Sequence, residues 1–390
     1  MTDINVRALS LAELTTHHSE KWSGFDPDVL PLPVAEMDFP VAEPIRKVLL
    51  EMVNSSDLGY LGLIPELGAG FAKFASERWS WNVDTSQVRI AADVGVGVVE
   101  ALRVFTQPGD SVLVNSPIYQ NFYNWIDETR LTMIDIPFTR TGLETEESNP
   151  WILDFDEVEK IYASGLKVHL LCSPHNPLGR IYSKNELIRI ADMAKKYGVL
   201  VISDEIHSPL TYTPHEFTPF LSVSDAAREV GVAVTSATKA WNLAGLKCAI
   251  IVSQNDAIHK KLDEMPKAVH FRASILGAYA SAAAFADSGP WLDAVIKNLD
   301  ENRFLLRDLL KAQLPTVRYN IPHNGYLAWL DMSSLNLGEN PAEALLEKGR
   351  VALNPGSLYG QQCTQYVRLN FATSPEIITE AMKRIVSTLK

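Results

Sequence analysis

The stretch Val232-Ala-Val-Thr-Ser-Ala-Thr-Lys239-Ala-Trp-Asn-Leu-Ala-Gly-Leu-Lys247 places two hydroxyl side chains and a lysine directly after a short apolar run. The apolar run is too brief for a helix and predicts a short buried strand. Ligands of α/β proteins commonly bind where strands leave the sheet. The hydroxyls of Ser236 and Thr238, together with Lys247, have the chemistry to hold a phosphate. A partly desolvated Lys239 would be a nucleophile able to form a Schiff base, although taken alone it is equally compatible with a surface lysine in an ordinary loop.

Three more strand-like runs end in a polar or aromatic side chain that suits ligand binding. Tyr119 follows the run at 111–115, Asn176 follows the run at 167–172, and Asp204 follows the run at 199–203. Predicted helices, such as the one over 184–197, give crossovers long enough for parallel strands. The sequence therefore predicts an α/β fold with a mostly parallel sheet, whose carboxyl edge would gather these residues beside Lys239.

The turn Asp93-Val-Gly-Val-Gly97 leads into a predicted helix. The N-terminus of a helix presents free N–H groups and a partial positive charge, which together suit an anion. The two glycines form a G-x-G pattern without the full dinucleotide fingerprint, so a plain tight turn explains them as well.

The two ends of the chain flank the predicted sheet. Prolines at 31, 33 and 40 enforce an extended path, so we expect 1–45 to be an arm that packs with the C-terminal part and not a folded unit. A long helix is predicted over 291–314. The predicted organisation is an arm at 1–45, a large domain at 46–285 and a smaller α+β domain at 286–390.

Arg368 is the one charge in the apolar run at 366–371. Arginine is rarely buried without a partner, and two partners are open to it. One is a carboxylate of the protein, in a structural salt bridge. The other is a substrate carboxylate, which the guanidinium fork would bind through two parallel hydrogen bonds.

The composition excludes several functional classes. The net charge of −12, from 35 basic and 47 acidic residues, and the absence of a long basic run give no counter-charge for nucleic acid or an anionic membrane. Cys172, Cys248 and Cys363 match no zinc spacing and do not make a closed disulfide framework. No stretch resembles a secretory signal or is long and apolar enough to span a bilayer, so we expect a cytoplasmic enzyme without a metal site.

Taken in order, these residues resemble the active-site set of fold-type I pyridoxal-phosphate enzymes. Within that group the chain looks most like the MalY/PatB-type cystathionine β-lyases, the carbon–sulfur lyase branch of the class I/II aminotransferase superfamily. The motifs that carry the likeness are Val34-Ala-Glu-Met-Asp-Phe39, Gly59-Tyr60, Ser173-Pro-His-Asn176-Pro-Leu-Gly-Arg180, Ser203-Asp-Glu-Ile-His207 and Ser236-Ala-Thr-Lys-Ala-Trp-Asn-Leu-Ala-Gly245.

The resemblance implies a role for each residue. As catalytic groups, Lys239 would carry the cofactor and act as the base at the substrate Cα, Asp204 would keep the ring nitrogen protonated, and Tyr119 would stack on the ring. The other residues that would hold the cofactor are Tyr60, Gly97, Val98, Val99, Asn176, His207, Ser236, Thr238 and Lys247. The residues that would contact the substrate, a small amino acid, are Ala35, Tyr60, Asn176 and Arg368. Tyr60 would reach the site of a partner subunit, so that a homodimer would share its active sites.

Three positions depart from the usual pattern of the superfamily. Lys247 stands where aminotransferases commonly have an arginine, and it keeps the charge but not the planar fork. Leu178 stands where many relatives have a threonine. His207 lies where many aminotransferases place a tyrosine on the ring oxygen, which favours the lyase branch, although a structural role for His207 fits equally well.

The resemblance leaves two reactions and one non-catalytic alternative. β-Elimination would convert cystathionine, or a related cysteine S-conjugate, to a thiol, pyruvate and ammonia. Transamination would use the same groups and would require a 2-oxo acid as amino acceptor. A transcription factor on this scaffold would need an N-terminal DNA-binding domain, for which the residues before the first predicted helix, at 43–53, leave no room.

Overall fold

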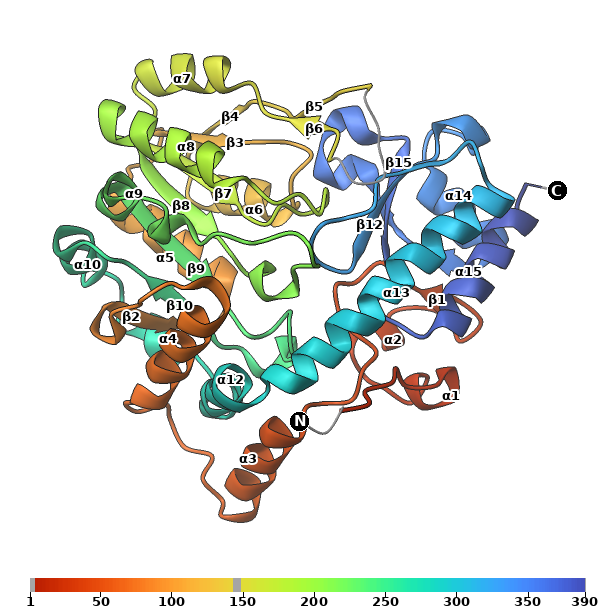
Figure 1. The fold of residues 1–390 in the computed structure, drawn as a ribbon, viewed down its shortest axis with the longest axis horizontal. Helices are drawn as coiled ribbons and strands as arrows, with labels where there is room; N and C mark the ends of the chain where they lie inside the picture. Colours follow the sequence, from red (N-terminus) through yellow and green to blue (C-terminus); the bar gives the residue numbers. More distant parts are fainter. Residues whose placement is uncertain (1–3, 143–148, 390) are drawn as a thin grey trace.

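The computed structural model describes residues 4–142 and 149–389. At its centre lies a seven-stranded sheet, the large sheet, with the strand order β2-β10-β9-β8-β7-β3-β4 (Figure 1). Its strands are β2 (Val88–Ala91), β3 (Ser111–Val114), β4 (Thr132–Asp135), β7 (Val168–Cys172), β8 (Leu200–Asp204), β9 (Gly231–Thr235) and β10 (Ala249–Val252). Strands β4, β3, β7, β8 and β9 pair in parallel, whereas β10 is antiparallel to both of its neighbours. The predicted α/β fold with a mostly parallel sheet is confirmed.

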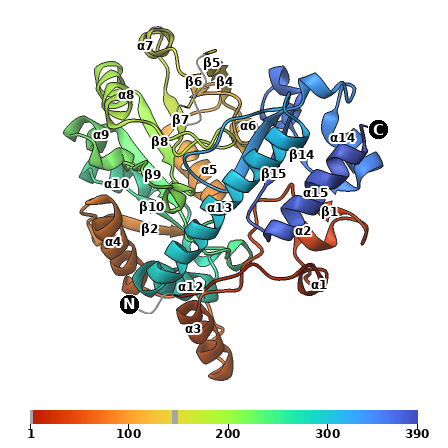
Figure 2. The ribbon, with the colours of Figure 1, turned by 45° about the vertical axis from the view of Figure 1, so that its right-hand side comes forward.

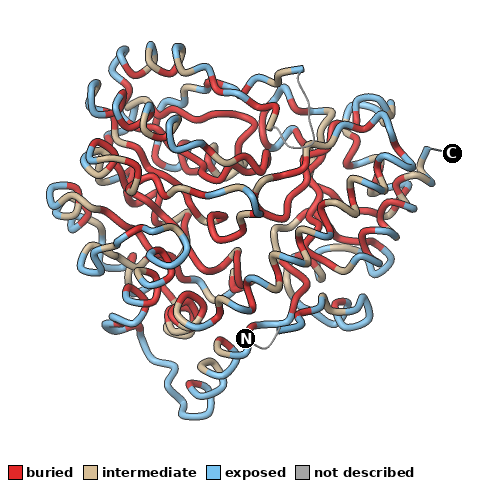
Figure 3. The backbone as a smooth tube through the Cα atoms, viewed as in Figure 1, coloured by how far each residue is buried: buried red, intermediate tan, exposed pale blue. Residues whose placement is uncertain are grey.

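The central strands are apolar along their whole length because both faces of the sheet are covered. Every residue of β7, β9 and β10 is buried, and so is every residue of β8 except the first. Side chains alternate between the two faces of a strand, so burial at successive positions requires a layer on each side. Figure 3 shows the strands buried and the outward sides of the helices exposed.

Helices cover the large sheet, connect its strands or pack on the covering helices. They are α3 (Glu43–Asn54), α4 (Pro65–Trp79), α5 (Val94–Phe105), α6 (Asn121–Glu128), α7 (Phe155–Ala163), α8 (Lys184–Tyr197), α9 (Asp225–Val230), α10 (Asp256–Leu262), α11 (Ala268–Phe271) and α12 (Ile275–Asp287). Of these, α3 packs against α12. Helix α8 has the bounds that its sequence predicts. It begins with a capping box between Ser183 and Glu186 and ends at Gly198 in the left-handed conformation, with φ 69°.

A second, antiparallel sheet lies in the C-terminal part of the chain. Its order is β11-β12-β15-β14, and the strands are β11 (Arg318–Tyr319), β12 (Leu327–Asp331), β14 (Asn354–Pro355) and β15 (Tyr366–Asn370). Helices α14 (Pro341–Gly349) and α15 (Pro375–Ser387) accompany it, and the long helix α13 (Gly289–Gln313) runs from the region of α12 toward this small sheet (Figure 2). The division at 45 and 285 stays a prediction.

The N-terminal segment contains more structure than the predicted arm. It has two one-turn helices, α1 (Leu11–Leu14) and α2 (Glu20–Ser23), and strand β1 (Leu30–Pro31), which pairs in parallel with β13 (Val351–Ala352). One helical turn is too short to leave a period in the sequence, which is why the pattern predicted only an extended path. The β1–β13 pairing places this segment beside the small sheet.

A short antiparallel pair lies between β4 and α7: β5 (Thr139–Arg140) and β6 (Trp151–Ile152). Residues 143–148 lie outside the described part of the chain. In 4–142 and 149–389, no helix combines the length and the apolar character that a bilayer span requires. The same ranges hold no group of three His, Cys, Asp or Glu side chains arranged to bind a metal ion.

Replacing Gly277 by alanine tests how closely α12 must approach the segment before Lys247. A Cβ atom at Gly277 would lie 1.9 Å from the Leu246 carbonyl oxygen, so the helix would have to move away. We expect Gly277→Ala to lower the free energy of unfolding in urea by about 2 kcal/mol or more.

Gly68→Ala in α4 is the matched control, because its Cβ would meet Thr85 at an ordinary 3.5 Å. Its better helix propensity should leave stability unchanged or raise it by up to about 1 kcal/mol. Equal losses of stability in the two variants would contradict the close approach at Gly277.

Candidate active site

The side chains predicted to bind a ligand gather at the carboxyl edge of the large sheet. Asp204 is the last residue of β8, and Lys239 follows β9. Asn176 follows β7 and Tyr119 follows β3, and neighbouring parallel strands end at the same edge. The charges of Arg368 and Asp204 both act on the pKa values of Lys239 and Tyr119, so these residues share one site.

Lys239 is a buried amine whose surroundings lower its pKa. Its Nζ donates a hydrogen bond to the carbonyl oxygen of Ala35 at 3.0 Å. Burial, followed by the positive charge of Arg368, lowers the pKa of Lys239 from its usual 10.5 to about 8, against the opposing charges of Glu36 and Asp204. A neutral amine attacks an aldehyde and accepts a proton, so the lowered pKa increases the fraction of Lys239 in the state that nucleophilic and base chemistry needs.

Asp204 is a buried carboxyl group near this amine. Its Oδ1 accepts the Ile206 N–H at 3.1 Å. Burial raises the pKa of Asp204 from 3.8 to about 7, and the Ile206 N–H and the charge of Lys239 oppose this shift only in part. Such a carboxylate is stabilised by any ligand that presents a positively charged N–H to it.

His207 is a buried neutral imidazole in the same region. Burial lowers the pKa of His207 to about 3, helped by the charges of Lys239 and Arg368. Its Nδ1 has no hydrogen-bond partner within the described ranges, and its ring lies edge-on to Tyr326 at 6.3 Å. A buried ring nitrogen without a partner costs stability unless a ligand pairs with it.

Arg368 lies on β15 and is buried, with 3% of its surface exposed. Nη1 donates to Asn176 Oδ1 at 3.1 Å, Nη2 donates to the Pro33 carbonyl oxygen at 2.9 Å, and the guanidinium lies over the Tyr359 ring at 5.0 Å. Nε has no partner, and no carboxylate pairs with Arg368 among the residues that the structure describes. The structural salt bridge left open by the sequence is absent there, and the guanidinium remains available to a substrate carboxylate.

The predicted phosphate position contains two polar clusters. Ser236 Oγ donates to the Cys248 carbonyl oxygen at 2.6 Å and lies 2.9 Å from Thr238 Oγ1, a second hydroxyl within hydrogen-bond distance. Lys247 is 3.4 Å from Asp93, whose other carboxylate oxygen caps α5 by accepting the Val96 N–H at 2.8 Å. Lys247 therefore lies beside the N-terminus of α5, which suits an anion, and Ser236 contacts the residue that follows Lys247.

The position of the backbone donors on α5 needs a correction. The prediction assigned the phosphate to Gly97, Val98 and Val99, but α5 begins at Val94, so these residues lie in or beyond its fourth position and are buried. The Gly97 N–H already donates to the Asp93 carbonyl oxygen at 3.0 Å. The first N–H groups of a helix are the ones without an internal partner, so the free donors lie at 94–95. The glycine pattern misled the prediction because it does not show where the helix begins.

The two predicted tyrosines differ in their surroundings. Tyr119 is half-buried, and its hydroxyl accepts a hydrogen bond from Asn121 Nδ2 at 2.8 Å. Tyr60 lies between α3 and α4 and is 90% exposed. No hydrogen bond or ring contact joins Tyr60 to the other site residues in the described part of this chain, so a single chain does not bring it into the site.

Comparison with known proteins identifies the family. The family of class I and II aminotransferases matches residues 27–385. The chain belongs to the class I and II aminotransferase family. A putative cystathionine β-lyase of Mycobacterium leprae is 38% identical over 99% of this chain and 98% of its own length. The cystathionine β-lyase of Corynebacterium glutamicum is 33% identical over 98% of this chain and 100% of its own length.

The solved structures agree with this assignment. The crystal structure of a putative PLP-dependent β-cystathionase from Corynebacterium diphtheriae has a TM-score of 0.92 and 30% identity to this aminotransferase-family chain, covering 99% of both. The predicted family and fold type are therefore confirmed, and the cofactor is pyridoxal 5′-phosphate.

The residues present fit this cofactor. Lys239 matches its aldehyde, and the buried carboxyl of Asp204 matches its ring nitrogen. Lys247 and the start of α5 match its phosphate. The unpaired Nδ1 of His207 leaves a buried polar atom for which a bound ligand would supply the partner.

Sequence reasoning missed Tyr326 and Asn370 in this aminotransferase-family site. The Tyr326 hydroxyl donates to the Ala35 carbonyl oxygen at 3.0 Å, beside Lys239. Asn370 Nδ2 donates to the carbonyl oxygens of Val34 and Glu36 at 2.7 and 2.6 Å. Both residues act on backbone carbonyls, which no side-chain pattern marks. The one available signal was their position: Asn370 lies in the same apolar run as Arg368, and Tyr326 directly precedes strand β12.

The raised pKa of Asp204 predicts a pH-dependent effect of Asp204→Asn on the cofactor-free protein. The folded-state pKa, about 7, lies above the usual 3.8, so the folded state binds this proton more tightly. The contribution of Asp204 to the free energy of unfolding therefore falls as the pH rises from 4 to 7, by about 1.4 kcal/mol for each unit of pKa difference. Asparagine does not titrate and can still accept the Ile206 N–H.

Urea denaturation of the two cofactor-free proteins checks this expectation. Asp204→Asn should be more stable than the parent at about pH 8 by at least roughly 1 kcal/mol, with a smaller difference near pH 4. The same variant should bind pyridoxal 5′-phosphate more weakly, because the ring nitrogen loses its carboxylate. A stability difference that does not change with pH would show that Asp204 titrates normally.

Proposed function

We propose that the protein is a pyridoxal-phosphate-dependent carbon–sulfur β-lyase that cleaves cystathionine or related cysteine S-conjugates to a thiol, pyruvate and ammonia. The observation that carries the proposal is the buried Arg368, which has no carboxylate partner in the described residues and faces the site of Lys239. A guanidinium beside a reactive amine matches the α-carboxylate of an amino acid whose α-amino group reacts at the cofactor. The full-length likeness to proteins named cystathionine β-lyase favours elimination.

The residues of the chain divide the work of the reaction. When bound, pyridoxal 5′-phosphate supplies a ring that accepts the electrons left on the substrate Cα. Lys239 takes the proton from Cα, and Arg368 holds the α-carboxylate while Asn176 holds the guanidinium through Oδ1. Asp204 keeps a proton at the ring nitrogen. The carbon–sulfur bond then breaks with its electron pair leaving on sulfur, and addition of one water to the remaining fragment gives pyruvate and ammonia.

His207, Tyr119 and the residues that would bind the phosphate complete the proposed site. His207 would pair through its free ring nitrogen with a polar atom of the cofactor, and Tyr119 would stack on the ring. Ser236, Thr238 and Lys247 would hold the phosphate with the first turn of α5. Ala35 would contact the substrate through its backbone, since its carbonyl already meets Lys239.

A substrate panel distinguishes elimination from transamination. Purified protein loaded with cofactor is incubated with cystathionine and other cysteine S-conjugates, with and without 2-oxoglutarate, and pyruvate and thiol are measured. We expect pyruvate and thiol in equal amounts without the 2-oxo acid, and at least about a thousandfold loss in Lys239→Ala. Amino-group transfer that requires 2-oxoglutarate, with no thiol released, would instead favour an aminotransferase.

We also propose that two copies of the chain form a homodimer with shared active sites. Several large apolar side chains near the start of α4 and the end of α11 are exposed: Leu58 by 55%, Tyr60 by 90%, Leu63 by 95% and Phe271 by 55%. A cavity of about 990 Å³ lies beside them, lined by 61–68, 85–90 and 262–271, and Lys239 does not line it. Exposed apolar side chains gathered around a cavity are typical of an interface, and the segment between α3 and α4 projects from the molecule (Figure 1).

Mixing two inactive variants tests the shared site. In a hybrid of Tyr60→Ala and Lys239→Ala chains, one site contains the Lys239 of the first chain and the Tyr60 of the second. Random pairing should therefore restore about a quarter of the parent activity. If Tyr60 served its own chain, or if the protein were a monomer by size-exclusion chromatography, the mixture would stay as inactive as its components.

We further place the protein in the cytoplasm. Cys172, Cys248 and Cys363 are all unpaired and buried. Free cysteines are typical of proteins kept in a reducing compartment, which supports this location.

A further inference from the structure

One residue of the small sheet, Asn370, holds three alternate carbonyl groups of the segment 32–37, which we call the arm segment. The Leu32 carbonyl oxygen accepts the backbone N–H of Asn370 at 2.8 Å. The carbonyl oxygens of Val34 and Glu36 accept the two hydrogens of Asn370 Nδ2, at 2.7 and 2.6 Å. The side-chain amide of Asn370 thus binds the carbonyl groups on either side of Ala35.

The intervening carbonyl groups of the arm segment meet the active site. The Pro33 carbonyl oxygen accepts from Arg368 Nη2 at 2.9 Å. The Ala35 carbonyl oxygen accepts from Lys239 Nζ at 3.0 Å and from the Tyr326 hydroxyl at 3.0 Å. Successive carbonyls of the arm segment therefore alternate between Asn370 on one side and the two cationic side chains of the site on the other.

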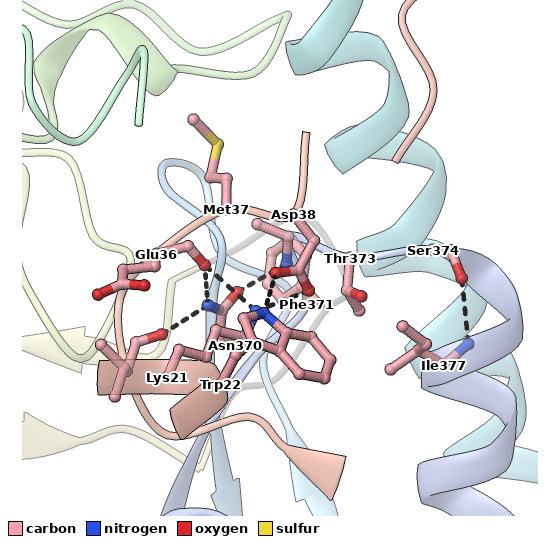
Figure 4. A network of polar contacts seen from close by, with 12 residues as sticks. Lys21, Trp22, Glu36, Met37, Asp38, Asn370, Phe371, Thr373, Ser374 and Ile377 are labelled. Atoms are coloured by element: carbon pink, nitrogen blue, oxygen red, sulfur yellow. Dashed lines mark hydrogen bonds and ion pairs between the residues drawn. The ribbon is translucent and has the colours of Figure 1, made fainter. Parts of the chain in front are cut away.

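The arm segment makes a tight turn at Ala35, and buried side chains hold it. The Glu36 N–H donates to the Val34 carbonyl oxygen at 2.9 Å, so the chain turns at Ala35. Lys21 Nζ also donates to the Glu36 carbonyl oxygen, at 3.3 Å, and forms a fully buried ion pair with Asp38 at 2.7 Å (Figure 4). Asn370 is completely buried, and its Oδ1 is occupied by an N–H two residues on. Both hydrogens and the oxygen of the Asn370 amide are engaged, so this side chain fixes the turn at Ala35 in one position.

We propose that Asn370 is a positioning residue of the active site: by holding the even-numbered carbonyls of the arm segment, it sets the odd-numbered carbonyls against Arg368 and Lys239. Arg368 has only two hydrogen bonds in the described structure, one of them to the arm segment. If the arm segment moves, the guanidinium loses one of these two hydrogen bonds, and its direction toward a substrate carboxylate is less firmly fixed. Asn370 would thus act through the arm segment and not by touching substrate or cofactor.

The substitution Asn370→Asp tests the proposal with almost no change of shape. The carboxylate can still accept through the oxygen that Asn370 uses now, but it places an oxygen against the Val34 and Glu36 carbonyl oxygens where a donor is required. Amide hydrogen exchange in the peptide covering 30–39 should become at least about tenfold faster in the cofactor-free protein. In the loaded enzyme, the KM for a cysteine S-conjugate should rise at least about fivefold while kcat changes less.

Asn298→Asp is the matched control. Asn298 Nδ2 also donates to two carbonyl oxygens, those of Val6 at 3.0 Å and Ala294 at 2.8 Å, and so anchors another part of the N-terminal segment. This variant should leave exchange over 30–39 and the KM close to the parent values. Asn370→Ser, which is too short to reach both carbonyls but adds no charge, replaces Asn370→Asp if the latter does not fold.

The outcomes separate this proposal from the lyase assignment on which its KM measurement rests. Unchanged exchange over 30–39 in the Asn370 variants, or equal changes in Asn298→Asp, would overturn the positioning role. Faster exchange with an unchanged KM would also overturn it, because the arm segment would then move without consequence for the site. If no S-conjugate is cleaved at all, the lyase proposal fails, and binding of the amino acid measured by the absorbance of the bound cofactor takes the place of KM.

Discussion

Two positive side chains, Arg368 and Lys239, share the active site without a carboxylate bonded to either among the described residues. Burial is the larger cause and the positive charge of Arg368 the next, and together they lower the pKa of Lys239 to about 8. The repulsion that destabilises the empty site thus also helps to bring the pKa of this amine close to physiological pH.

Neutral carbonyl groups make this arrangement tolerable. Pro33 and Ala35 offer one carbonyl oxygen to each cation, and a ring of Tyr359 lies against the guanidinium. A carboxylate in their place would neutralise Arg368 permanently and would compete with the substrate for it. Partial negative charges from the backbone stabilise the cations without occupying the position proposed for the substrate carboxylate. The N-terminal segment is therefore part of the active site and not an appendage to the fold.

The same logic separates two adjacent acids at the end of β8. Burial raises the pKa of Asp204 to about 7 and that of Glu205 to about 8. Glu205 is satisfied inside the protein by the Ser203 hydroxyl at 3.0 Å and the Phe220 N–H at 2.8 Å. Asp204 has one backbone donor and faces the site. Both acids are costly to ionise where they lie, but only Asp204 leaves the compensation to a ligand.

The sequence predicted the elements with strong periodicity and the residues whose chemistry is rare. Helix α8 and the buried strands were evident from apolar spacing and caps, and Arg368 was evident as a single charge in an apolar strand. The one-turn helices α1 and α2 were not, because a period needs more than one turn to be visible. The start of α5 was misplaced because the capping residue, Asp93, and not the glycines, fixes where the free N–H groups lie.

The contacts that sequence could not supply are those made to the backbone. Asn370 is one polar residue in a strand, and nothing in its neighbours shows that it holds the turn at Ala35, more than three hundred positions away. Such contacts depend on how the N-terminal segment crosses the small sheet, which only the packed structure determines.

These backbone contacts also explain how chemistry and selectivity can be separated in this fold. The groups proposed to hold the α-amino acid portion are buried and tied to one another through the backbone, whereas the exposed segment around Tyr60 can change its side chains without disturbing them. In the proposed homodimer, selection among S-conjugates would therefore be free to vary on the exposed segment while the buried set stays constant.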